Sequence, residues 1–490
     1  MAQNLPFVAF NSGEIGQEVM LRTNIEGYTS TAAIMENWLP RPAGPMDFRP
    51  GWKMCAELDA TKRVRGIEYV YDTETYGILL SDLEMRFEQN GGIIVRPAVT
   101  AAIVDSTFAL PLNGWVDISS GAGTSTGGAT GLVLTSNGTS IAGVRQAVTI
   151  NQVGTTHGLR IVVASGPVTL RLGSTSGGEE YTRTDLRTGV HSIGVVPTSG
   201  TLYIEITSTA NVARTVTSCA IEAAGDLVLP TPWAESQIDG LRHDQTNDVL
   251  WFTSGVGKTR RIERRSSAAW SIVDTAETDG PFLDPNTDSS YTVTPSVQSG
   301  SGTLAASRAL WKAGHVGALW KITHSGQFAT SALAGVEQYT NPVKVQGVGS
   351  SRQFAYTITG TFVATVTLQR SIGNTTSWTD VATFTTTADT TYLDGSTFDN
   401  QTCYYRFGIK TGNYTSGTAT VTVTYTGGST DGVVRITSFA SSTSVGMDVL
   451  SPLGATSATT EWAEGAWSDA QVWPKATALY DGDRKSTRLN

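Results

Sequence analysis

The stretch RGIEYVYDTETYGILLSDLEMRFEQNGGIIV, residues 65–95, predicts the fold class of this chain. Apolar residues recur at alternate positions in its short runs, which is the period of a strand with one buried face. An Asn-Gly-Gly turn at 90–92 is the composition of a tight hairpin. We therefore expect a meander of antiparallel strands over 65–71, 76–80, 84–88 and 93–95.

The composition agrees with a β protein of several domains. The chain has 490 residues, of which 39% are hydrophobic and only 16% charged, and it is rich in Gly, Thr and Ser. Its net charge of −9 argues against a protein that binds polyanions with its whole surface. No apolar run approaches the roughly 20 residues of a membrane helix, and Met1 is followed by no leader, so we expect no membrane segment. The three cysteines, Cys55, Cys219 and Cys403, are widely separated and odd in number, so they imply no disulfide framework.

Residues 1–100 contain, besides the meander, the best candidate for a helix. It covers residues 24–39, with Asn24 suited to cap its first turn and Pro40 to end it. Its apolar residues recur at three and four, which places them on one helical face: Ile25, Tyr28, Ala32, Met35 and Leu39.

Two Thr-rich blocks are typical of β-sandwiches. In residues 101–228, short alternating runs are separated by Gly-rich turns, and we expect a sandwich of jelly-roll type. Residues 346–428 repeat this style on a smaller scale, which predicts an immunoglobulin-like sandwich. The expected strands are 132–134, 158–164, 168–172 and 202–206 in the first block, and 362–368, 404–409 and 419–425 in the second.

The intervening segments have another character. Residues 229–345 contain three closely spaced strands at 248–252, 260–264 and 270–273, as in a propeller blade, and 429–482 resume with a Trp-rich run. We therefore predict a mainly β fold: an incomplete β-propeller-type scaffold with two inserted β-sandwich domains and one short N-terminal helix. Residues 1–100, 229–345 and 429–482 would form one discontinuous domain.

The last eight residues, DRKSTRLN (483–490), resemble in-frame read-through of a sequencing adaptor. A natural basic tail is the alternative. We expect the chain to be a metagenomic gene fragment truncated near Gly482, and leave these residues out of the fold prediction.

The densest positive cluster is Arg260, Arg261, Arg264 and Arg265. On a strand, Arg261 and Arg265 share one face and Arg260 and Arg264 the other. One interpretation is a solvated edge strand protected by its charge. The more specific interpretation is a contact with an acidic neighbouring subunit.

No motif for catalysis, cofactor or metal binding is complete, so we expect a protein that is not an enzyme. Residues 255–259, GVGKT, lack the first Gly and the helix of a phosphate loop and predict a hairpin turn. Residues 284–288, DPNTD, lack the Gly and Glu of a calcium loop. The five histidines are not at metal-ligand spacing, and Glu179 and Glu180 would point to opposite faces of a strand. The sequence leaves open the alternative that two carboxylates far apart in the chain meet in the fold as an acid and base pair.

Scattered motifs in the right order resemble the tail nozzle proteins (tail tubular protein B) of short-tailed phages. At the N-terminal end these are Phe10-Asn-Ser-Gly13-Glu14, Arg22, Tyr28, Asn37, Arg49-Pro50-Gly51, Ile67-Glu-Tyr-Val-Tyr71, Arg86-Phe87 and Gly91-Gly92. Later come Thr278-Asp-Gly-Pro-Phe282, Asn286, His315-Val-Gly317, Tyr404-Tyr-Arg406, Tyr414-Thr-Ser-Gly417, Glu461-Trp462, Gly465-Ala-Trp-Ser468 and Trp473-Pro474. Many relatives have Arg-Arg-Pro-Gly where this chain has Phe48-Arg-Pro-Gly51, which leaves any role of the first Arg without support.

The resemblance implies a virion structural protein, assembled in the cytoplasm of the bacterial host. It implies a homo-oligomeric ring at the end of the tail that contacts portal or adaptor proteins and tail fibres. DNA would pass through its channel without specific binding, since an acidic wall repels phosphates. One alternative is a receptor- or carbohydrate-binding tail protein that uses the 101–228 sandwich, where Trp115 and Tyr203 are the few aromatic candidates. Another is a polysaccharide-degrading enzyme, which needs two carboxylates about 5–10 Å apart.

Overall fold

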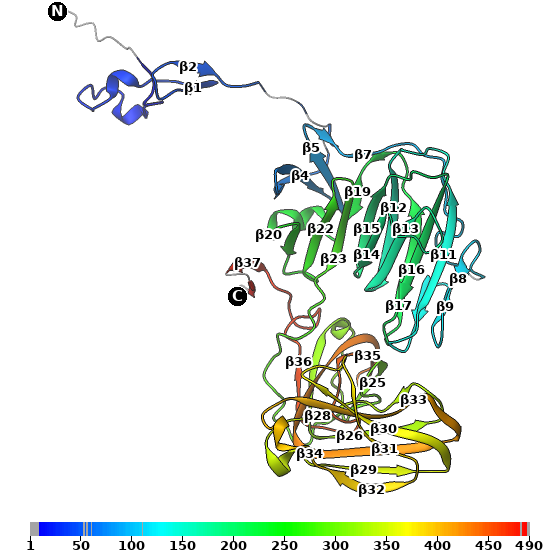
Figure 1. Cartoon of the computed structure of the whole chain (residues 1–490). Helices are drawn as coiled ribbons and strands as arrows, with labels where there is room; N and C mark the ends of the chain where they lie inside the picture. Colours follow the sequence, from blue (N-terminus) through cyan, green and yellow to red (C-terminus); the bar gives the residue numbers. More distant parts are fainter. Residues whose placement is uncertain are drawn as a thin grey trace, which may run out of the picture. The chain divides into compact units, whose positions relative to one another are not determined.

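The structure is a computed structural model that describes residues 9–51, 54, 57–59, 61–109, 111–480 and 483–487. Antiparallel strands dominate it, so the prediction of a mainly β fold is confirmed (Figure 1). The chain divides into two compact units, Met1–Asp59 and Ala60–Asn490. Cys55 lies outside the described residues, and Cys219 and Cys403 are buried free thiols.

The first unit is built from turns and one hairpin. Its regular elements are the 3-10 helices η1 (Gln17–Val19) and η2 (Tyr28–Ser30) and the paired strands β1 (Trp38–Pro40) and β2 (Met46–Phe48). The rings of Trp38 and Phe48 lie 4.0 Å apart across this hairpin. Among the described residues of this unit, no apolar side chain is buried.

The prediction of an α-helix over 24–39 is wrong. Only the single turn η2 is helical there, and the segment ends in β1. Gly27 and Asn37 interrupt it in the left-handed region, at φ 81° and 63°. The stretch Thr29-Ser-Thr31 adds β-branched and hydroxyl side chains, which favour other conformations over a helix interior. The spacing of apolar residues was a helical signal, but this unit offers no apolar surface on which such a stripe could be buried.

The meander predicted over 65–95 is confirmed. Its strands pair in sequence order, and β5 also pairs with a later strand, β19 (Val228–Pro230). Ile78 and Phe87, on the face that points inward, are fully buried. The strands are β3 (Arg65–Tyr71), β4 (Glu74–Ser81), β5 (Glu84–Gln89) and β6 (Gly92–Ile93).

A second antiparallel meander packs against the first. Trp270 stands at the centre of their shared core, with its ring stacked 4.3 Å from that of Phe87. The three strands predicted in this region are confirmed, and a fourth precedes them. They are β20 (Arg242–Thr246), β21 (Val249–Thr253), β22 (Arg260–Ser266) and β23 (Ala269–Asp274). Four such strands are the size of one propeller blade; a propeller built from several blades stays a prediction.

The block 101–228 contains a jelly roll. Its strands form two sheets, ordered β10-β17-β12-β15 and β14-β13-β16-β11, which enclose one apolar core. Consecutive strands lie in opposite sheets, except for the hairpin of β13 and β14. The four strands predicted in this block are confirmed as β10, β12, β13 and β16. The strands are β10 (Leu132–Thr135), β11 (Ala142–Thr149), β12 (His157–Ser165), β13 (Val168–Gly173), β14 (Thr182–Leu186), β15 (Gly189–Val195), β16 (Thr201–Ser208) and β17 (Arg214–Ile221).

The jelly roll contacts the two meanders where the chain enters and leaves it. The chain enters through β7 (Val95–Arg96) and leaves through β18 (Gly225–Asp226), and these two strands pair. Arg96 is buried there; its Nε lies 2.6 Å from Glu222 Oε2 and its Nη2 donates to the Ala268 carbonyl at 2.8 Å. In addition β15 pairs with β23, so one nine-stranded sheet runs through the jelly roll and the second meander. The prediction of one discontinuous domain of residues 1–100, 229–345 and 429–482, with 101–228 inserted into it, is therefore wrong, because the jelly roll shares a sheet with β20–β23 and residues 1–59 form a unit of their own. The joined sheet removes two open strand edges.

The second half of the unit shares its strands in the same way. β26 (Leu319–Leu333) pairs along its length with residues 419–435 of β34 (Ala419–Ser441). One part of this ladder belongs to the sheet with β24 (Val293–Pro295), β25 (Ser301–Ala306), β35 (Ser444–Ser451) and β36 (Trp462–Glu464). The other part pairs with β29 (Phe354–Thr359), which pairs with β32 (Ala388–Tyr392).

The small sandwich is therefore larger than predicted. Its other sheet contains β27 (Gln338–Tyr339), β28 (Val343–Val345), β30 (Phe362–Ile372), β31 (Thr379–Phe384) and β33 (Cys403–Gly417). The strands predicted at 362–368, 404–409 and 419–425 are confirmed. The predicted limits at 345/346 and 428/429 are wrong, because Val343 and Val345 belong to the core of this sandwich and β34 crosses residue 428.

The C-terminal segment returns to the second meander. The Gly255 amide donates to the Pro474 carbonyl at 2.9 Å, and the Leu479 amide to Asp244 Oδ2 at 2.6 Å. Strand β37 (Ala476–Tyr480) then pairs with β38 (Asp483–Thr487). The proposed origin of 483–490 as adaptor sequence is not tested by this pairing, and 488–490 lie outside the described residues.

A buried histidine predicts an acid-sensitive fold. His191 Nε2 donates to the Arg187 carbonyl at 2.8 Å, and Nδ1 lies 2.9 Å from Ser271 Oγ, from which a neutral ring accepts. Burial lowers the pKa of His191 to about 3, from 6.5. The unfolded chain therefore binds a proton that the native chain does not, and stability is lost as the pH falls below about 6.5.

We expect the free energy of unfolding to fall by about 2 kcal/mol more in the native sequence than in His191→Gln between about pH 7 and pH 5. Urea unfolding at the two pH values measures this difference. His243→Gln, at an exposed ring, is the control and should keep most of the pH dependence. Equal pH dependence in His191→Gln and the native sequence would contradict the prediction.

Candidate functional site

The four arginines predicted as a subunit contact lie on β22, a central strand between β21 and β23. They are therefore not on an edge strand, which corrects one of the two interpretations. Strand order is a long-range property that local alternation does not encode. Their side chains are 9–23% exposed: Arg260 23%, Arg261 13%, Arg264 9% and Arg265 21%.

Each of these arginines has a partner within the chain. Arg261 and Arg265 share Glu263, at 2.6 and 2.9 Å, which confirms that they lie on one face of the strand. On the other face, Arg264 pairs with Glu74 and donates to Tyr76 Oη at 2.8 Å, and Arg260 pairs with Asp274. The contacts of Arg264 join the two meanders, and the ion pairs of the other three arginines lie within the second meander. A contact with another subunit stays a prediction.

The N-terminal motif residues come together in the first unit. The Met35 amide donates to Glu14 Oε2 at 3.1 Å, and the Arg49 amide donates to the Asn37 carbonyl at 2.8 Å. Tyr28 Oη donates to the Met20 carbonyl at 2.6 Å. Gly13 occupies a turn at φ 77°. The remaining motif residues of this unit are Arg22, Pro50 and Gly51.

Three later motif segments also converge, although they are far apart in the sequence. The Ala466 amide donates to the Pro281 carbonyl at 2.8 Å, and Phe282 forms a bridge with Gly465. His315 Nε2 lies 3.2 Å from Glu464 Oε1 in a buried setting. Burial raises the pKa of Glu464, but hydrogen bonds from His315 and Gln471 outweigh this and leave the pKa lowered.

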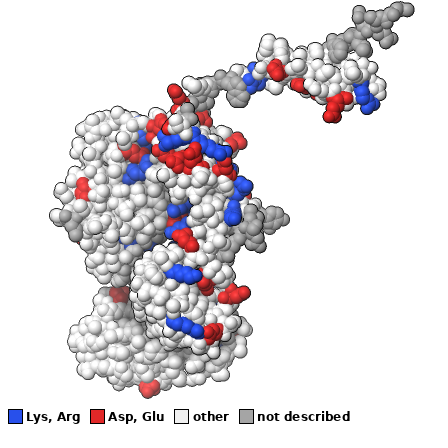
Figure 2. Space-filling model, turned by 180° about the vertical axis from the view of Figure 1, so that it is seen from behind, with Lys and Arg blue, Asp and Glu red and all other residues white. Residues whose placement is uncertain are grey.

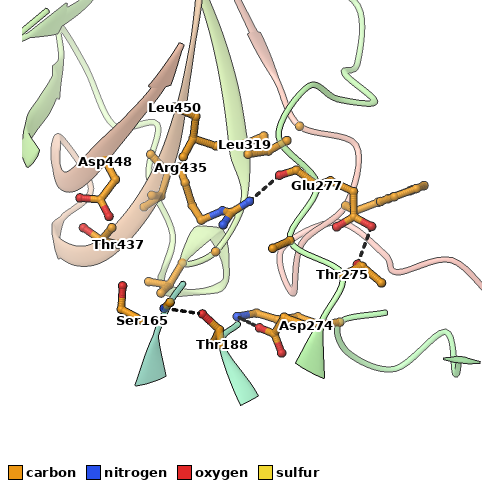
Figure 3. Close-up of a pocket in the computed structure, with 18 of the residues that line it drawn as sticks. Ser165, Thr188, Asp274, Thr275, Glu277, Leu319, Arg435, Thr437, Asp448 and Leu450 are labelled. Atoms are coloured by element: carbon orange, nitrogen blue, oxygen red, sulfur yellow. Dashed lines mark hydrogen bonds and ion pairs between the residues drawn. The ribbon is translucent and has the colours of Figure 1, made fainter. Parts of the chain in front are cut away.

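One cavity of the second unit has a volume of about 480 Å³. Jelly-roll loops, the ends of β22 and β23, and strands β34 and β35 with the Trp-rich segment all contribute to its wall (Figure 3). Six of the lining residues are charged: Arg214, Lys258, Asp274, Glu277, Arg435 and Asp448.

The charges in this cavity are unevenly paired. Asp274 is held by Lys258, at 3.2 Å, and by Arg260. Arg435 donates only to the backbone carbonyl of Glu277, and Arg214 makes no hydrogen bond or ion pair among the described residues. Burial lowers the pKa of Arg214 and of Arg435. Two desolvated guanidinium groups thus face one cavity.

Sequence reasoning did not single out this cavity. In the sequence, Arg214 and Arg435 are isolated charged residues at strand positions. No local pattern predicts that they meet in the fold. Trp467 and Trp473 also line the cavity, and the sequence signals them only through the Trp-rich run and the resemblance.

The incomplete motifs are turns. Residues 255–259 connect the antiparallel strands β21 and β22, so the predicted hairpin is confirmed. In the segment 284–288, Asn286 Nδ2 donates to the Thr460 carbonyl at 2.9 Å, and Asp288 pairs with Arg308. Within the described ranges, no group of three or more His, Cys, Asp or Glu is placed to hold a metal ion. No helix in that same part of the chain is long and apolar enough to cross a membrane.

No family model and no curated protein matches this chain. Among solved structures, it is similar to AerE from Microcystis aeruginosa, at 7% sequence identity and a TM-score of 0.10, over 73% of this chain and 96% of that one. It is also similar to Streptomyces albus HEPD with 2-hydroxyethylphosphonate and Fe(II) bound, at 9% identity and a TM-score of 0.14, over 68% and 78%. Likeness at these TM-scores carries no argument about fold or function.

Proposed function

We propose that this chain is a structural subunit of the tail nozzle of a short-tailed phage. The observation that carries the proposal is the convergence of the motif segments 278–282, 315–317 and 461–468, which carry the resemblance to this family. Ala466 donates its amide to the Pro281 carbonyl at 2.8 Å, and His315 Nε2 lies 3.2 Å from Glu464 Oε1. Segments that were selected by sequence alone thus build one structural cluster.

The first unit supports a role in an assembly. Large apolar side chains of this unit are exposed, among them Leu21 at 94%, Phe48 at 74% and Ile34 at 72%. A unit without an apolar core of its own gains stability when a further surface covers such side chains. In a ring, the neighbouring subunit provides that surface through a head-to-tail contact. Broad uncharged areas on one face of the chain also suit such contacts (Figure 2).

The proposal places the subunit in the virion, in contact with portal or adaptor proteins and tail fibres. A net charge of −9 suits a channel wall along which DNA moves without being held. The jelly roll and the small sandwich extend from the shared sheets and are available for other contacts.

We expect the full chain to self-associate into closed rings, and the double variant Ile34→Ser/Phe48→Ser to shift the population towards monomers. Light scattering gives the mass, and negative-stain electron microscopy gives the symmetry. Val256→Ser is the matched control, since Val256 is 66% exposed in the second unit. A chain that stays monomeric at every concentration, or an equal effect of Val256→Ser, would contradict the proposal.

A further inference from the structure

The cavity of the second unit has the size and the position of a ligand site. Its volume of about 480 Å³ is within the range of about 300–1,000 Å³ typical of small-molecule sites. Segments from the jelly roll, the second meander and the β34–β35 sheet line it, and sites where several substructures meet are common places for ligands.

The guanidinium groups of Arg214 and Arg435 provide the first recognition element. Both side chains are half-buried, and neither forms an ion pair among the described residues, so an anionic group bound directly to them would offset their desolvation. Of the carboxylates nearby, Asp274 is neutralised by Lys258 and Arg260. Asp448 accepts from Ser301 Oγ at 2.8 Å and attracts both arginines, and Glu277 attracts Arg435. An anionic group of a ligand would compensate the two arginines, and carboxylates match the planar fork of arginine.

Indole rings provide the second element. Trp467 and Trp473 both line the cavity, and Trp473 is held by its Nε1, which donates to Asp469 at 2.6 Å. Indoles combine a large apolar surface with a rigid shape, which suits the flat C–H face of a sugar ring.

Hydroxyl and carboxylate groups provide the third element. Ser165, Thr188, Thr437 and Glu277 lie around the cavity, and Figure 3 shows them on different sides of Arg435. Such groups donate to and accept from sugar hydroxyls.

We propose that this cavity binds an acidic saccharide, with its carboxylate between Arg214 and Arg435 and a sugar ring packed against Trp467. The three elements together select this class of ligand. A plain anion would leave the indoles unused, and a neutral sugar would leave the two guanidinium groups without an ion pair. The proposal does not depend on the nozzle role, because it rests on the cavity alone.

Isothermal titration of the full chain with digalacturonate, galactobiose, inorganic phosphate and acetate tests the proposal. We expect digalacturonate to bind at least about tenfold more tightly than the neutral disaccharide and the small anions, since charge-assisted hydrogen bonds and stacking act together. Equal binding of galactobiose would overturn the role of the arginines. Equal binding of phosphate or acetate would overturn the saccharide assignment, and so would no binding of digalacturonate.

Variants assign the binding to this cavity. Arg214→Gln should weaken digalacturonate binding by about 10- to 100-fold, and Trp467→Leu should weaken it while leaving any phosphate binding unchanged. The control is Arg183→Gln, at a jelly-roll arginine that is 58% exposed and outside the cavity. If Arg214→Gln does not fold, Arg435→Lys keeps the charge, loses the planar fork and should still weaken binding. Unchanged binding in the folded cavity variants would overturn the proposal.

Discussion

Asp394→Asn is expected to lower the free energy of unfolding of the small sandwich by about 3–5 kcal/mol. Asp394 and Arg352 form an ion pair of 2.7 Å, and both side chains are 0% exposed. Arg352 also donates to the carbonyls of Gln401, at 2.8 Å, and Gly347, at 3.3 Å. The variant preserves the shape of the side chain but removes its charge, so a buried guanidinium group is left without its counter-ion.

Hydrogen exchange of the strands β29–β34 measures this loss locally, which matters because the second unit has several cores. Asp380→Asn is the matched control, since Asp380 forms a pair of equal length with Lys410 at the surface, where its side chain is 44% exposed. It should leave the exchange rates nearly unchanged, because exposed pairs contribute little. Replacing both partners, as Arg352→Met/Asp394→Leu, should restore most of the lost stability. A similar loss in the two single variants would contradict the argument.

The contrast between this pair and the β22 arginines shows what sequence patterns encode. Alternation correctly predicted the faces of Arg261 and Arg265, because side chains alternate along any strand. It did not predict that β22 is central, since strand order depends on partners elsewhere in the chain. Glu74, which pairs with Arg264, is 190 residues away in the sequence.

Local composition also failed at the limits of the small sandwich. Gly427-Gly428-Ser429 has the composition of a linker, but in the structure it lies inside β34, at a register shift where residues 426–428 face the single residue Gly326 of β26. Glycine at such a point lets a paired ladder bend without ending, so composition alone does not separate this case from a connection between domains. The strands themselves were predictable because their alternation is local.

The cavity lay beyond sequence reasoning for the same reason. Arg214 begins one strand, Arg435 lies within another, and the Trp-rich segment follows both. Only the folded chain brings them together. Motifs quoted for the resemblance, in contrast, carried long-range information, since 278–282 and 461–468 are neighbours in space.

Trp270→Ala is expected to destabilise the packing of the two meanders by about 3–5 kcal/mol, the usual cost of removing a large aromatic side chain from a core. Trp270 is 0% exposed, and its ring lies 4.3 Å from that of Phe87, 5.1 Å from Tyr69 and 5.2 Å from Tyr76. Three rings of the first meander therefore lose their common partner in a single substitution. Urea unfolding measures the loss.

The same variant tests whether residues 65–95 depend on the second meander for their structure. Strands of one small sheet need a covering layer to be stable, so loss of this contact should expose 65–95 to trypsin before the jelly roll. Trp251→Ala is the control, because Trp251 lies on the opposite face of the same sheet, next to Arg261. It should change cleavage much less. If Trp270→Ala unfolds the jelly roll and the meander together, the shared nine-stranded sheet, rather than this core, is the unit that unfolds cooperatively.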